Sequence, residues 1–366
     1  MAGAHNKARE ILLYPSDAKY EESIRQFQGC PTIAATPKGR LFLGWYSGGT
    51  KEPHIDNYNL LVKSDDGGKT WSRPVLVIPS SRDELVHALD IQLWMAPTGE
   101  LHVYWVQNDV VKKGTDIPDA VGEQPLVAVD EFVFNDFTHS MWRSICRDPD
   151  ADALEFGEPE CVDTGFLRCK PTVLKSGRLL FFNYDQMTDT YGYSISDDGG
   201  KTHTRRYGAK KVRTRFDEAM AYQLSDGSIR MFARAKTYRL IESVSRDNGE
   251  TWSDAEVTDI LSPDTRFFVS RTPSGRIMLV HNDSEESRCN MTVKLSEDDG
   301  KTWKYSRTID TRNKVSYPDA DFHGGKIYLT YDRERTGAKE ILFLSFTEED
   351  IMNPDYTFDI RIVSKP

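Results

Sequence analysis

The residues of this chain that could do chemistry are arginines, one lysine, carboxylates, histidines and tyrosines that recur along its whole length. They are Arg25, Glu52, His54, Asp56, His87, Asp90, Arg168, Lys170, Asp185, Arg215, Asp217, Glu218, Arg234, Tyr238, Arg266, His281, Arg288, Tyr317, Asp319, Asp332, Arg333 and Arg335. A guanidinium group holds a carboxylate through two parallel hydrogen bonds and stays charged, so several of them together indicate a site for an anionic ligand. The alternative is that the same residues pair as solvated surface salt bridges.

The position of these residues depends on a repeat in the sequence. Four segments follow the pattern Ser-x-Asp-x-Gly-x-Thr-Trp, the second with His203 in place of the tryptophan, and they begin at Ser64, Ser196, Ser245 and Ser296. The pattern suits a tight turn between two strands, because aspartate accepts hydrogen bonds from backbone amides, glycine adopts a positive φ and tryptophan covers the turn. Calcium binding is the alternative, but one or two carboxylates fall short of the roughly six to eight oxygens that this ion takes. We therefore expect structural turns.

A second repeat, a glycine turn followed by an apolar strand, alternates with the first at a spacing of about fifty residues. Its six copies begin at Gly39, Gly99, Gly177, Gly227, Gly275 and Gly325. Degenerate copies of the first pattern at 144–148 and 345–348 bring that set to six as well. The two repeats predict an all-β fold, a six-bladed β-propeller with four antiparallel strands in each blade, formed by residues 1–366 as a single domain.

Two further features of the propeller follow from the spacing. The extra length in the early part of the chain falls at about residues 107–140, and we expect this insertion to lie over one face as a lid. We expect a strand at about residues 10–14 to complete the last blade, because closing the ring removes exposed sheet edges.

The topology of a blade gathers the chemical residues at one end of the propeller axis. The first strand of a blade runs into the glycine turn and the second returns, so the loop between the second and third strands lies where the first strand starts. The residues above fall in these two kinds of segment, and we expect them to line a central cup. The candidate substrate-binding residues are Arg25, His54, Asp90, Lys170, Arg215, Arg234, Arg266 and Arg288.

Composition and charge exclude several other classes of function. A formal net charge of -10 and a pI near 5.4 argue against a nucleic-acid or membrane-surface partner, because phosphate binding needs a net basic face. The sequence shows neither a signal peptide nor an apolar stretch long enough to span a bilayer, so we expect a cytoplasmic protein. Five cysteines without a CxxC pair indicate neither a disulfide framework nor a zinc site. We expect no metal and no cofactor.

The repeats and a few local motifs resemble the sialidase (neuraminidase) superfamily, whose propellers carry the Asp-box or BNR repeat. Beyond the turns, Glu218 is followed sixteen residues later by Arg234, as in that family. The likeness covers nearly the whole chain and is to a divergent bacterial branch. The segments that carry that likeness are Tyr46-Ser47-Gly48-Gly49, Arg215-Phe216-Asp217-Glu218, Arg266-Phe267-Phe268 and Ser316-Tyr317-Pro318-Asp319.

The resemblance implies a role for each of several residues. In sialidases three arginines grip the substrate carboxylate, a tyrosine paired with a glutamate is the nucleophile, and an aspartate is the acid/base. Carried over, Tyr317 is the nucleophile, Glu218 its partner and Asp56 the acid/base, with Glu52 and His54 as competitors in the same loop. Two of the carboxylate-binding arginines match Arg234 and either Arg288 or Arg266. A neutral phenol approaches an anionic sugar without the repulsion that a carboxylate nucleophile would meet.

The chain departs from the family at the start of the first blade. Sialidases have Arg-Ile-Pro there, whereas this chain has Gly29-Cys30-Pro31, so the first carboxylate-binding arginine is missing from its place. Arg25, four residues earlier, is the candidate replacement. The resemblance implies an exo-acting glycoside hydrolase that releases a terminal acidic sugar from a small carbohydrate. The alternatives are a lyase that cleaves a uronate linkage and a non-catalytic carbohydrate-binding propeller.

Overall fold

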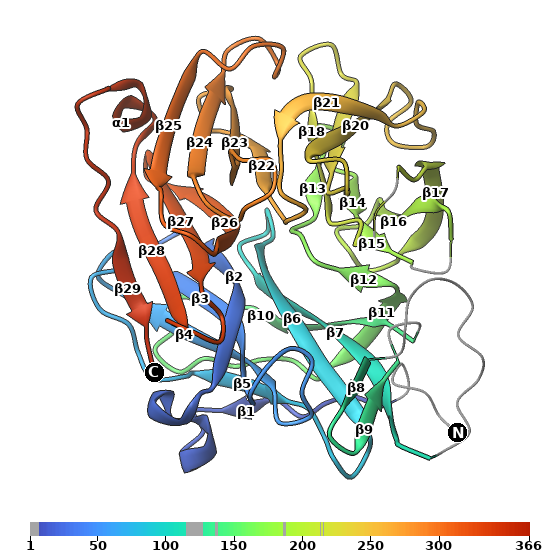
Figure 1. Ribbon diagram of the computed structural model, residues 1–366, viewed down its shortest axis with the longest axis vertical. Coiled ribbons are helices and arrows are strands. Elements are labelled where there is room, and N and C mark those ends of the chain that lie inside the picture. Colours follow the sequence, from blue (N-terminus) through green and yellow to red (C-terminus); the bar gives the residue numbers. More distant parts are fainter. Residues whose placement is uncertain (1–6, 115–126, 136–137, 186–187, 213, 215) are drawn as a thin grey trace.

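The fold is a ring of six β-blades around a central axis (Figure 1). The computed structural model describes residues 7–114, 127–135, 138–185, 188–212, 214 and 216–366. Each blade is built on a basic plan of four antiparallel strands, so the predicted all-β, six-bladed propeller is confirmed. Among the described residues, no helix has both the length and the apolar character that crossing a membrane would require.

The first two blades carry additions to the basic four strands. Blade 1 consists of β2 (Phe27–Ala35), β3 (Leu41–Gly48), β4 (Tyr58–Ser64) and β5 (Leu76–Pro79), with β1 (Leu12–Leu13) at its outer edge. Blade 2 consists of β6 (Val86–Met95), β7 (Leu101–Lys112), β10 (Ser140–Cys146) and β11 (Glu160–Thr164), and β8 (Val127–Val129) and β9 (Phe132–Phe134) extend it.

The other four blades follow the basic plan, although the two inner strands of blade 3 are each interrupted. Blade 3 consists of β12 (Phe166–Leu167) and β13 (Thr172–Val173), β14 (Leu179–Phe181) and β15 (Asn183–Tyr184), β16 (Thr190–Ser196) and β17 (Thr204–Lys210). Blade 4 consists of β18 (Ala219–Gln223), β19 (Ile229–Ala233), β20 (Arg239–Ser245) and β21 (Glu256–Leu261). Blade 5 consists of β22 (Phe268–Arg271), β23 (Ile277–Asn282), β24 (Met291–Ser296) and β25 (Tyr305–Asp310). Blade 6 consists of β26 (Val315–His323), β27 (Lys326–Arg333), β28 (Glu340–Phe346) and β29 (Arg361–Ser364), with the short helix α1 (Glu348–Met352) between its last two strands.

The repeated Ser-x-Asp-x-Gly-x-Thr segments are structural turns. In the first copy the Asp66 carboxylate accepts hydrogen bonds from the Ser64 hydroxyl at 2.8 Å and from the Thr70 amide and hydroxyl at 2.9 and 2.7 Å. The same contacts recur at Asp198, Asp247 and Asp298. Trp71 then packs edge-on against Phe343 of the neighbouring blade 6, with ring centroids 5.3 Å apart. The turns therefore fasten one blade to the next.

The ring closes in a different way from the one expected. The strand predicted at residues 10–14 is found as β1, but it pairs with β5 at the outer edge of blade 1 and not with the last blade. The fourth strand of blade 6 comes from β29, which pairs with β28 and leaves no place for the N-terminal strand there. Blades 1 and 6 are joined instead by side chains: Asp319 accepts from the Ile33 amide at 2.9 Å, and Asp332 from the Cys30 amide at 2.8 Å.

The insertion in blade 2 begins as a continuation of β7. The hairpin of β8 and β9 pairs with the end of β7, and Phe132 and Phe134 pack with Ile55 from the β3–β4 loop of blade 1. The hairpin thus lies against blade 1 at the periphery of the cup. The centre of the expected lid, residues 115–126, lies outside the described residues.

Candidate active site

Three innermost strands carry the same local irregularity, and each one directs a side chain toward the axis. The pairing of β2, β6 and β26 with its neighbour shifts at a β-bulge, and the bulges contain Cys30, Asp90 and Tyr317. All three residues have a positive φ, of 56°, 49° and 56°. A non-glycine residue in this region costs about 1–3 kcal/mol, and such bulges commonly re-aim a side chain beside a functional site.

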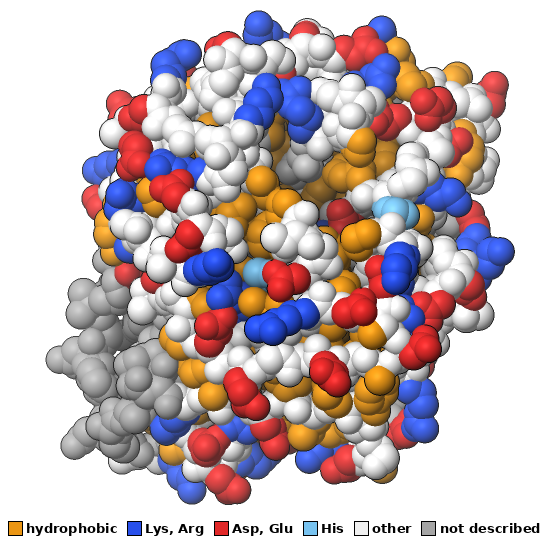
Figure 2. Space-filling view, turned by 180° about the vertical axis from the view of Figure 1, so that it is seen from behind, with side chains coloured by type: hydrophobic (Ala, Val, Ile, Leu, Met, Phe, Trp, Pro, Cys, Tyr) orange, Lys and Arg blue, Asp and Glu red, His pale blue; other side chains and the backbone are white. Residues whose placement is uncertain are grey.

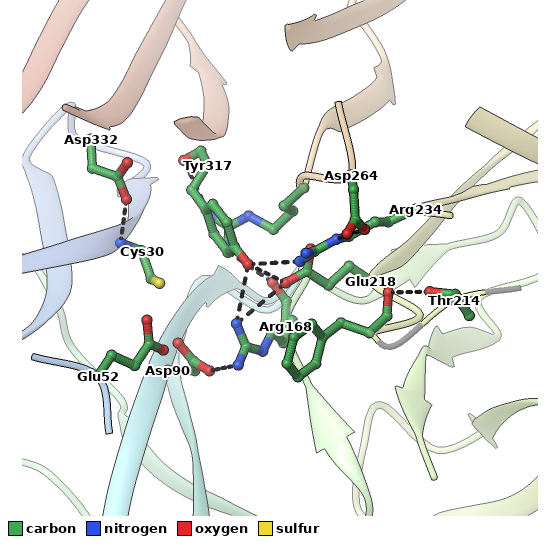
Figure 3. A network of polar contacts seen from close by, with 12 residues as sticks. Cys30, Glu52, Asp90, Arg168, Thr214, Glu218, Arg234, Asp264, Tyr317 and Asp332 are labelled. Atoms are coloured by element: carbon green, nitrogen blue, oxygen red, sulfur yellow. Dashed lines mark hydrogen bonds and ion pairs between the residues drawn. The ribbon is translucent and has the colours of Figure 1, made fainter. Parts of the chain in front are cut away.

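Tyr317 and Glu218 form a buried hydrogen-bonded couple at the axis (Figure 3). Tyr317 stands on β26 of blade 6, and Glu218 directly precedes β18 of blade 4. The phenolic hydroxyl donates to Glu218 Oε1 at 2.6 Å, and both side chains are buried, with 3% and 0% of their surface exposed. The structure therefore brings together the two residues that the sequence assigned to one catalytic pair.

Two arginines hold this couple from blades 3 and 4. Arg234 Nη1 donates to Glu218 at 2.9 Å and to the Tyr317 hydroxyl at 3.1 Å. Arg168 Nη1, beyond the end of β12, donates to the same two groups at 3.3 Å each. Both guanidinium groups therefore face the phenolic oxygen, where negative charge would develop if Tyr317 lost its proton.

The charges around the couple set its protonation. Burial disfavours the carboxylate form of Glu218, but the two guanidinium groups of Arg234 and Arg168 outweigh it and lower its pKa to about 2. Burial and the adjacent Glu218 carboxylate raise the pKa of Tyr317 to about 12, against the opposing effect of the same arginines. At neutral pH the resting state is therefore an ionised Glu218 that accepts a hydrogen bond from a neutral phenol.

A second acidic group lies on the blade 1 and blade 2 side of the cup. One oxygen each of Glu52 and Asp90 and the Cys30 sulfur lie within 4.8 Å of one another (Figure 3). Burial raises the pKa of Asp90 to about 6, although Arg168 at 3.0 Å opposes that shift. These three donor types could bind a metal ion, but Asp90 already pairs with Arg168, and Glu52 pairs with Arg335 at 3.0 Å. Two neighbouring cations favour these ion pairs over a bound metal.

Arg266 and Lys170, both predicted to bind substrate, hold the inner strands together instead. Arg266 donates to three backbone carbonyl oxygens, those of Arg168, Pro31 and Tyr317, at 2.9, 2.8 and 3.2 Å. The Lys170 ammonium is satisfied by the Asp319 carboxylate at 3.1 Å and by two backbone carbonyl oxygens. Cations that tie together strands of different blades in this way serve the fold, and the predicted contact of either residue with a substrate stays a prediction.

A pocket on the other side of Lys170 opens at the far end of the axis, where the innermost strands finish. It has a volume of 290 Å³, and its wall includes Trp94, Met220, Phe268 and Phe322. Figure 2, which shows the molecule from behind, has a hollow near the middle of that face with hydrophobic side chains around it. Lys170 is part of the wall of this pocket.

The structure places Arg25, His54 and Asp56 away from the couple of Tyr317 and Glu218. Arg25 lies between blades 1 and 6, where its guanidinium donates to Ser364 Oγ at 3.2 Å and to the Tyr20 carbonyl at 3.1 Å. His54 lies beneath the β8–β9 hairpin, 3.4 Å from Asp130. Asp56 forms a two-pronged pair with Arg82 at 2.8 and 2.7 Å on the surface.

None of these three predicted residues therefore enters the network of Tyr317 and Glu218 in the described part of the chain. In the loop that was expected to supply the acid/base, Glu52 is the carboxylate that reaches the cup. Arg215 lies outside the described residues.

Three arginines lie near the Tyr317 ring: Arg266, described above, has its guanidinium 4.8 Å from the ring centroid, and Arg288 and Arg335 are the other two. Arg288, one of the predicted binding residues, has its guanidinium 5.5 Å from the ring centroid, and that of Arg335 lies at 4.2 Å. Arg335 was expected in the cup, but it was not among the candidate substrate-binding residues. The same holds for Arg168, whose role depends on contacts from blades 2, 4 and 6 that no local pattern reveals.

Comparison with known proteins places this geometry in a family. Residues 39–329 match the model of the BNR repeat-like domain. The chain belongs to this family. Anhydrosialidase from Macrobdella decora is 28% identical over 220 residues, which are 53% of this chain and 29% of that protein, so the match spans less than a third of the length of this relative.

Solved structures agree with the BNR repeat-like fold. The intramolecular trans-sialidase from Ruminococcus gnavus superposes with a TM-score of 0.67 at 17% identity, covering 94% of this chain and 98% of that one. The K499G mutant of NanB sialidase from Streptococcus pneumoniae superposes with a TM-score of 0.64 at 16% identity, covering 90% and 68%. The predicted likeness to sialidase-type BNR propellers is thereby confirmed, and at these identities the structures show the fold alone.

Proposed function

We propose that this BNR repeat-like protein is an exo-acting glycoside hydrolase that releases a terminal acidic sugar from a small carbohydrate. The observation that carries the proposal is the buried 2.6 Å hydrogen bond between Tyr317 and Glu218 with two guanidinium groups on the phenolic oxygen. A tyrosine alone is a poor nucleophile, and this arrangement supplies both a proton acceptor and stabilisation for the phenolate. The sialidases among the similar proteins support the same reaction class.

The first half of the reaction forms a bond to Tyr317. Its oxygen attacks the anomeric carbon, its proton passes to Glu218, and the bond from that carbon to the leaving oxygen breaks. Because the pKa values of the two groups are about 12 and about 2, the proton moves only as the new bond acidifies the phenol. Arg168 and Arg234 stabilise the charge on the oxygen during this transfer.

Glu52 is the acid/base in this proposal. It must be protonated when the substrate binds. It then donates that proton to the leaving oxygen in the first step and regains one from water in the second, when water attacks the anomeric carbon and Tyr317 regains its proton from Glu218. The Glu52 carboxylate reaches the cup from the β3–β4 loop, and Arg335 holds it at 3.0 Å. Asp56, which the sequence favoured for this role, is held by Arg82 at the surface.

The test is turnover of a panel of aryl glycosides that includes the α-glycoside of N-acetylneuraminic acid, a glucuronide and neutral hexosides. Tyr317→Phe removes the nucleophile, and we expect it to lower kcat by at least a thousandfold on the best substrate. Tyr193→Phe is the matched control, because Tyr193 is also a buried tyrosine whose hydroxyl donates a hydrogen bond, here to the Gly249 carbonyl at 2.8 Å in blade 4.

Three results would contradict the proposal. Full activity in Tyr317→Phe would exclude the nucleophile. An unsaturated product that absorbs in the ultraviolet would indicate a lyase, and binding without turnover of any panel member would indicate a carbohydrate-binding propeller. The cytoplasmic location expected from the sequence stays a prediction.

A further inference from the structure

The start of β2 has a glycine where a side chain would project into the cup, and its space is already filled. A Cβ atom built on Gly29 would lie 2.7 Å from Cδ and Nε of Arg335 and 2.8 Å from its Cγ. These are atoms of the stem of the arginine, so the side chain of Arg335 lies directly against the Gly29 backbone. Any larger residue at position 29 would have to displace it.

The loop that carries Arg335 is fastened to β2 at this point. Residues 334–339 connect β27 to β28, and the Arg335 carbonyl accepts a hydrogen bond from the Gln28 amide at 3.0 Å. The Gln28 side chain donates to the Lys339 carbonyl in the same loop at 2.5 Å. The arginine is therefore delivered into the cup by a segment with a fixed position relative to blade 1.

The end of the Arg335 side chain is oriented as precisely as its base is anchored. Its Nε donates to Asp332 at 2.9 Å and its Nη1 to Glu52 at 3.0 Å, while the guanidinium lies 4.2 Å from the centre of the Tyr317 ring. Its third nitrogen, Nη2, has no hydrogen-bond partner in the described part of the chain. An oriented guanidinium with a spare donor is suited to receive an anionic oxygen.

The arginines of the cup differ in what they leave open. Arg266 is occupied by three carbonyl oxygens. Arg168 and Arg234 each contact one carboxylate oxygen of Glu218 and so hold the couple of Tyr317 and Glu218. Arg288 and Arg335, in contrast, both line a surface cavity of 640 Å³ between blades 5 and 6. These two residues flank the nucleophile on the side where a ligand could enter.

We propose that Arg335, together with Arg288, binds the carboxylate of the acidic sugar, and that Gly29 is required because it makes room for Arg335. The inference rests on the proposed function for the class of ligand. Blade 1 has Gly29 instead of an arginine at the start of β2. Arg335, from the β27–β28 loop of blade 6, thus places its guanidinium beside Tyr317 in the cup. A second consequence is that Arg335 positions Glu52, since it holds both that carboxylate and the ligand.

The test is equilibrium binding of N-acetylneuraminic acid and of D-glucuronic acid, measured by calorimetry and independent of turnover. We expect Arg335→Met, which keeps most of the length of the side chain and removes its charge, to weaken binding of the more tightly bound acid by at least tenfold. Gly29→Ala, which leaves every charge in place, should weaken it by about threefold to tenfold. The double variant Gly29→Arg with Arg335→Ala returns an arginine to blade 1 and should recover most of the affinity.

Two further variants keep the outcome interpretable. Arg333→Met is the matched control. Arg333 ends β27 two residues earlier, and its guanidinium pairs with Glu340 at 3.1 Å and not with the Tyr317 ring, so this variant should bind the acid with unchanged affinity. Arg335→Lys retains a cation beside Asp332 and Glu52, and it should fold even if Arg335→Met does not. We expect it to bind more weakly than the wild type, because lysine lacks the fork that grips a carboxylate.

The results separate this inference from the proposed function. The role of Arg335 would be overturned if the wild type bound neither acid. It would also be overturned if Arg335→Met and Arg335→Lys both bound the acid with unchanged affinity. Unchanged affinity in Gly29→Ala would overturn the role of Gly29. Arginine-dependent binding with no turnover on any glycoside would leave the inference standing and refute the hydrolase.

Discussion

Replacing Glu218 by glutamine should destabilise the protein as well as inactivate it, because the change removes a buried negative charge from between two arginines. Glu218 is fully buried and contacts Arg168 at 3.3 Å, Arg234 at 2.9 Å and the Tyr317 hydroxyl at 2.6 Å. Glutamine has nearly the same shape, so packing is retained. What changes is that two guanidinium groups lose their shared anion and face an amide that also carries donors.

The size of the effect follows from the pKa of Glu218. That pKa falls from an ordinary value of 4.5 to about 2 in the folded protein, and each pKa unit corresponds to about 1.4 kcal/mol. The ionised form is therefore favoured by the fold by about 3 kcal/mol, in spite of its burial. A group with a lowered folded pKa stabilises above its unfolded pKa, and this stabilisation is lost as the pH falls through the folded value.

The assay is urea unfolding of the wild type and Glu218→Gln across a range of pH. At pH 7 we expect the free energy of unfolding to fall by about 3 kcal/mol, and the difference to shrink between pH 4.5 and pH 2 as the wild-type carboxylate is protonated. Glu250→Gln is the matched control: Glu250 also bridges two arginines, at 2.6 and 3.3 Å, but its side chain is 40% exposed. Its loss should cost less than about 1 kcal/mol.

The reasoning would be refuted if the two glutamate variants lost equal stability at pH 7. It would also be refuted if the deficit of Glu218→Gln did not change between pH 7 and the acid limit. In either case the arginines would be stabilised by something other than the Glu218 charge.

Two further predictions concern other strained positions. Burial raises the pKa of Asp90 from 3.8 to about 6, so the fold disfavours its charged form. The free energy of unfolding of Asp90→Asn should therefore equal that of the wild type near pH 3.5 and exceed it by up to about 3 kcal/mol once the pH has risen from 3.8 through 6. A difference in unfolding free energy that narrows with rising pH in denaturation curves would contradict this. Gly68→Ala should lower the melting temperature much more than Gly67→Ala. Both glycines have a positive φ, of 82° and 72°, but a Cβ on Gly68 would lie 2.1 Å from the Phe343 ring and one on Gly67 would meet nothing within 4 Å, so equal shifts would contradict the proposed packing.

The repeats explain why so much of the fold could be predicted. Each Ser-x-Asp-x-Gly-x-Thr turn is satisfied almost entirely by its own atoms, as Asp66 is by Ser64 and Thr70. Local satisfaction leaves a local signature, and four full copies and two degenerate ones, in constant phase with six glycine turns, predict six blades. The closure of the ring has no such signature. Whether β1 or β29 completes blade 6 depends on which strand finds a free edge, and that is a tertiary question.

The site divides along the same line. Tyr317, Glu218 and Arg234 were predicted correctly as neighbours because they stand at fixed places in the repeat and in family motifs. The contacts of Arg25 and Lys170 with other blades were not predicted. Both stand near the start of an innermost strand, but the nearest carbonyl and carboxylate groups, which come from other blades, decide which way each cation turns.

By itself, the sequence determined the number of blades, the turns between their strands and the end of the axis at which the reactive side chains gather, because those depend on contacts within about fifty residues. Only the tertiary structure decided which charges pair. Arg335 reaches the cup from the last blade because Gly29 in the first blade leaves it room, and Glu52 rather than Asp56 enters because Arg82 holds Asp56 outside. Burial decides these pairings, because the attraction within an ion pair is strongest, and the free-energy cost of an unpaired charge is highest, where water is excluded.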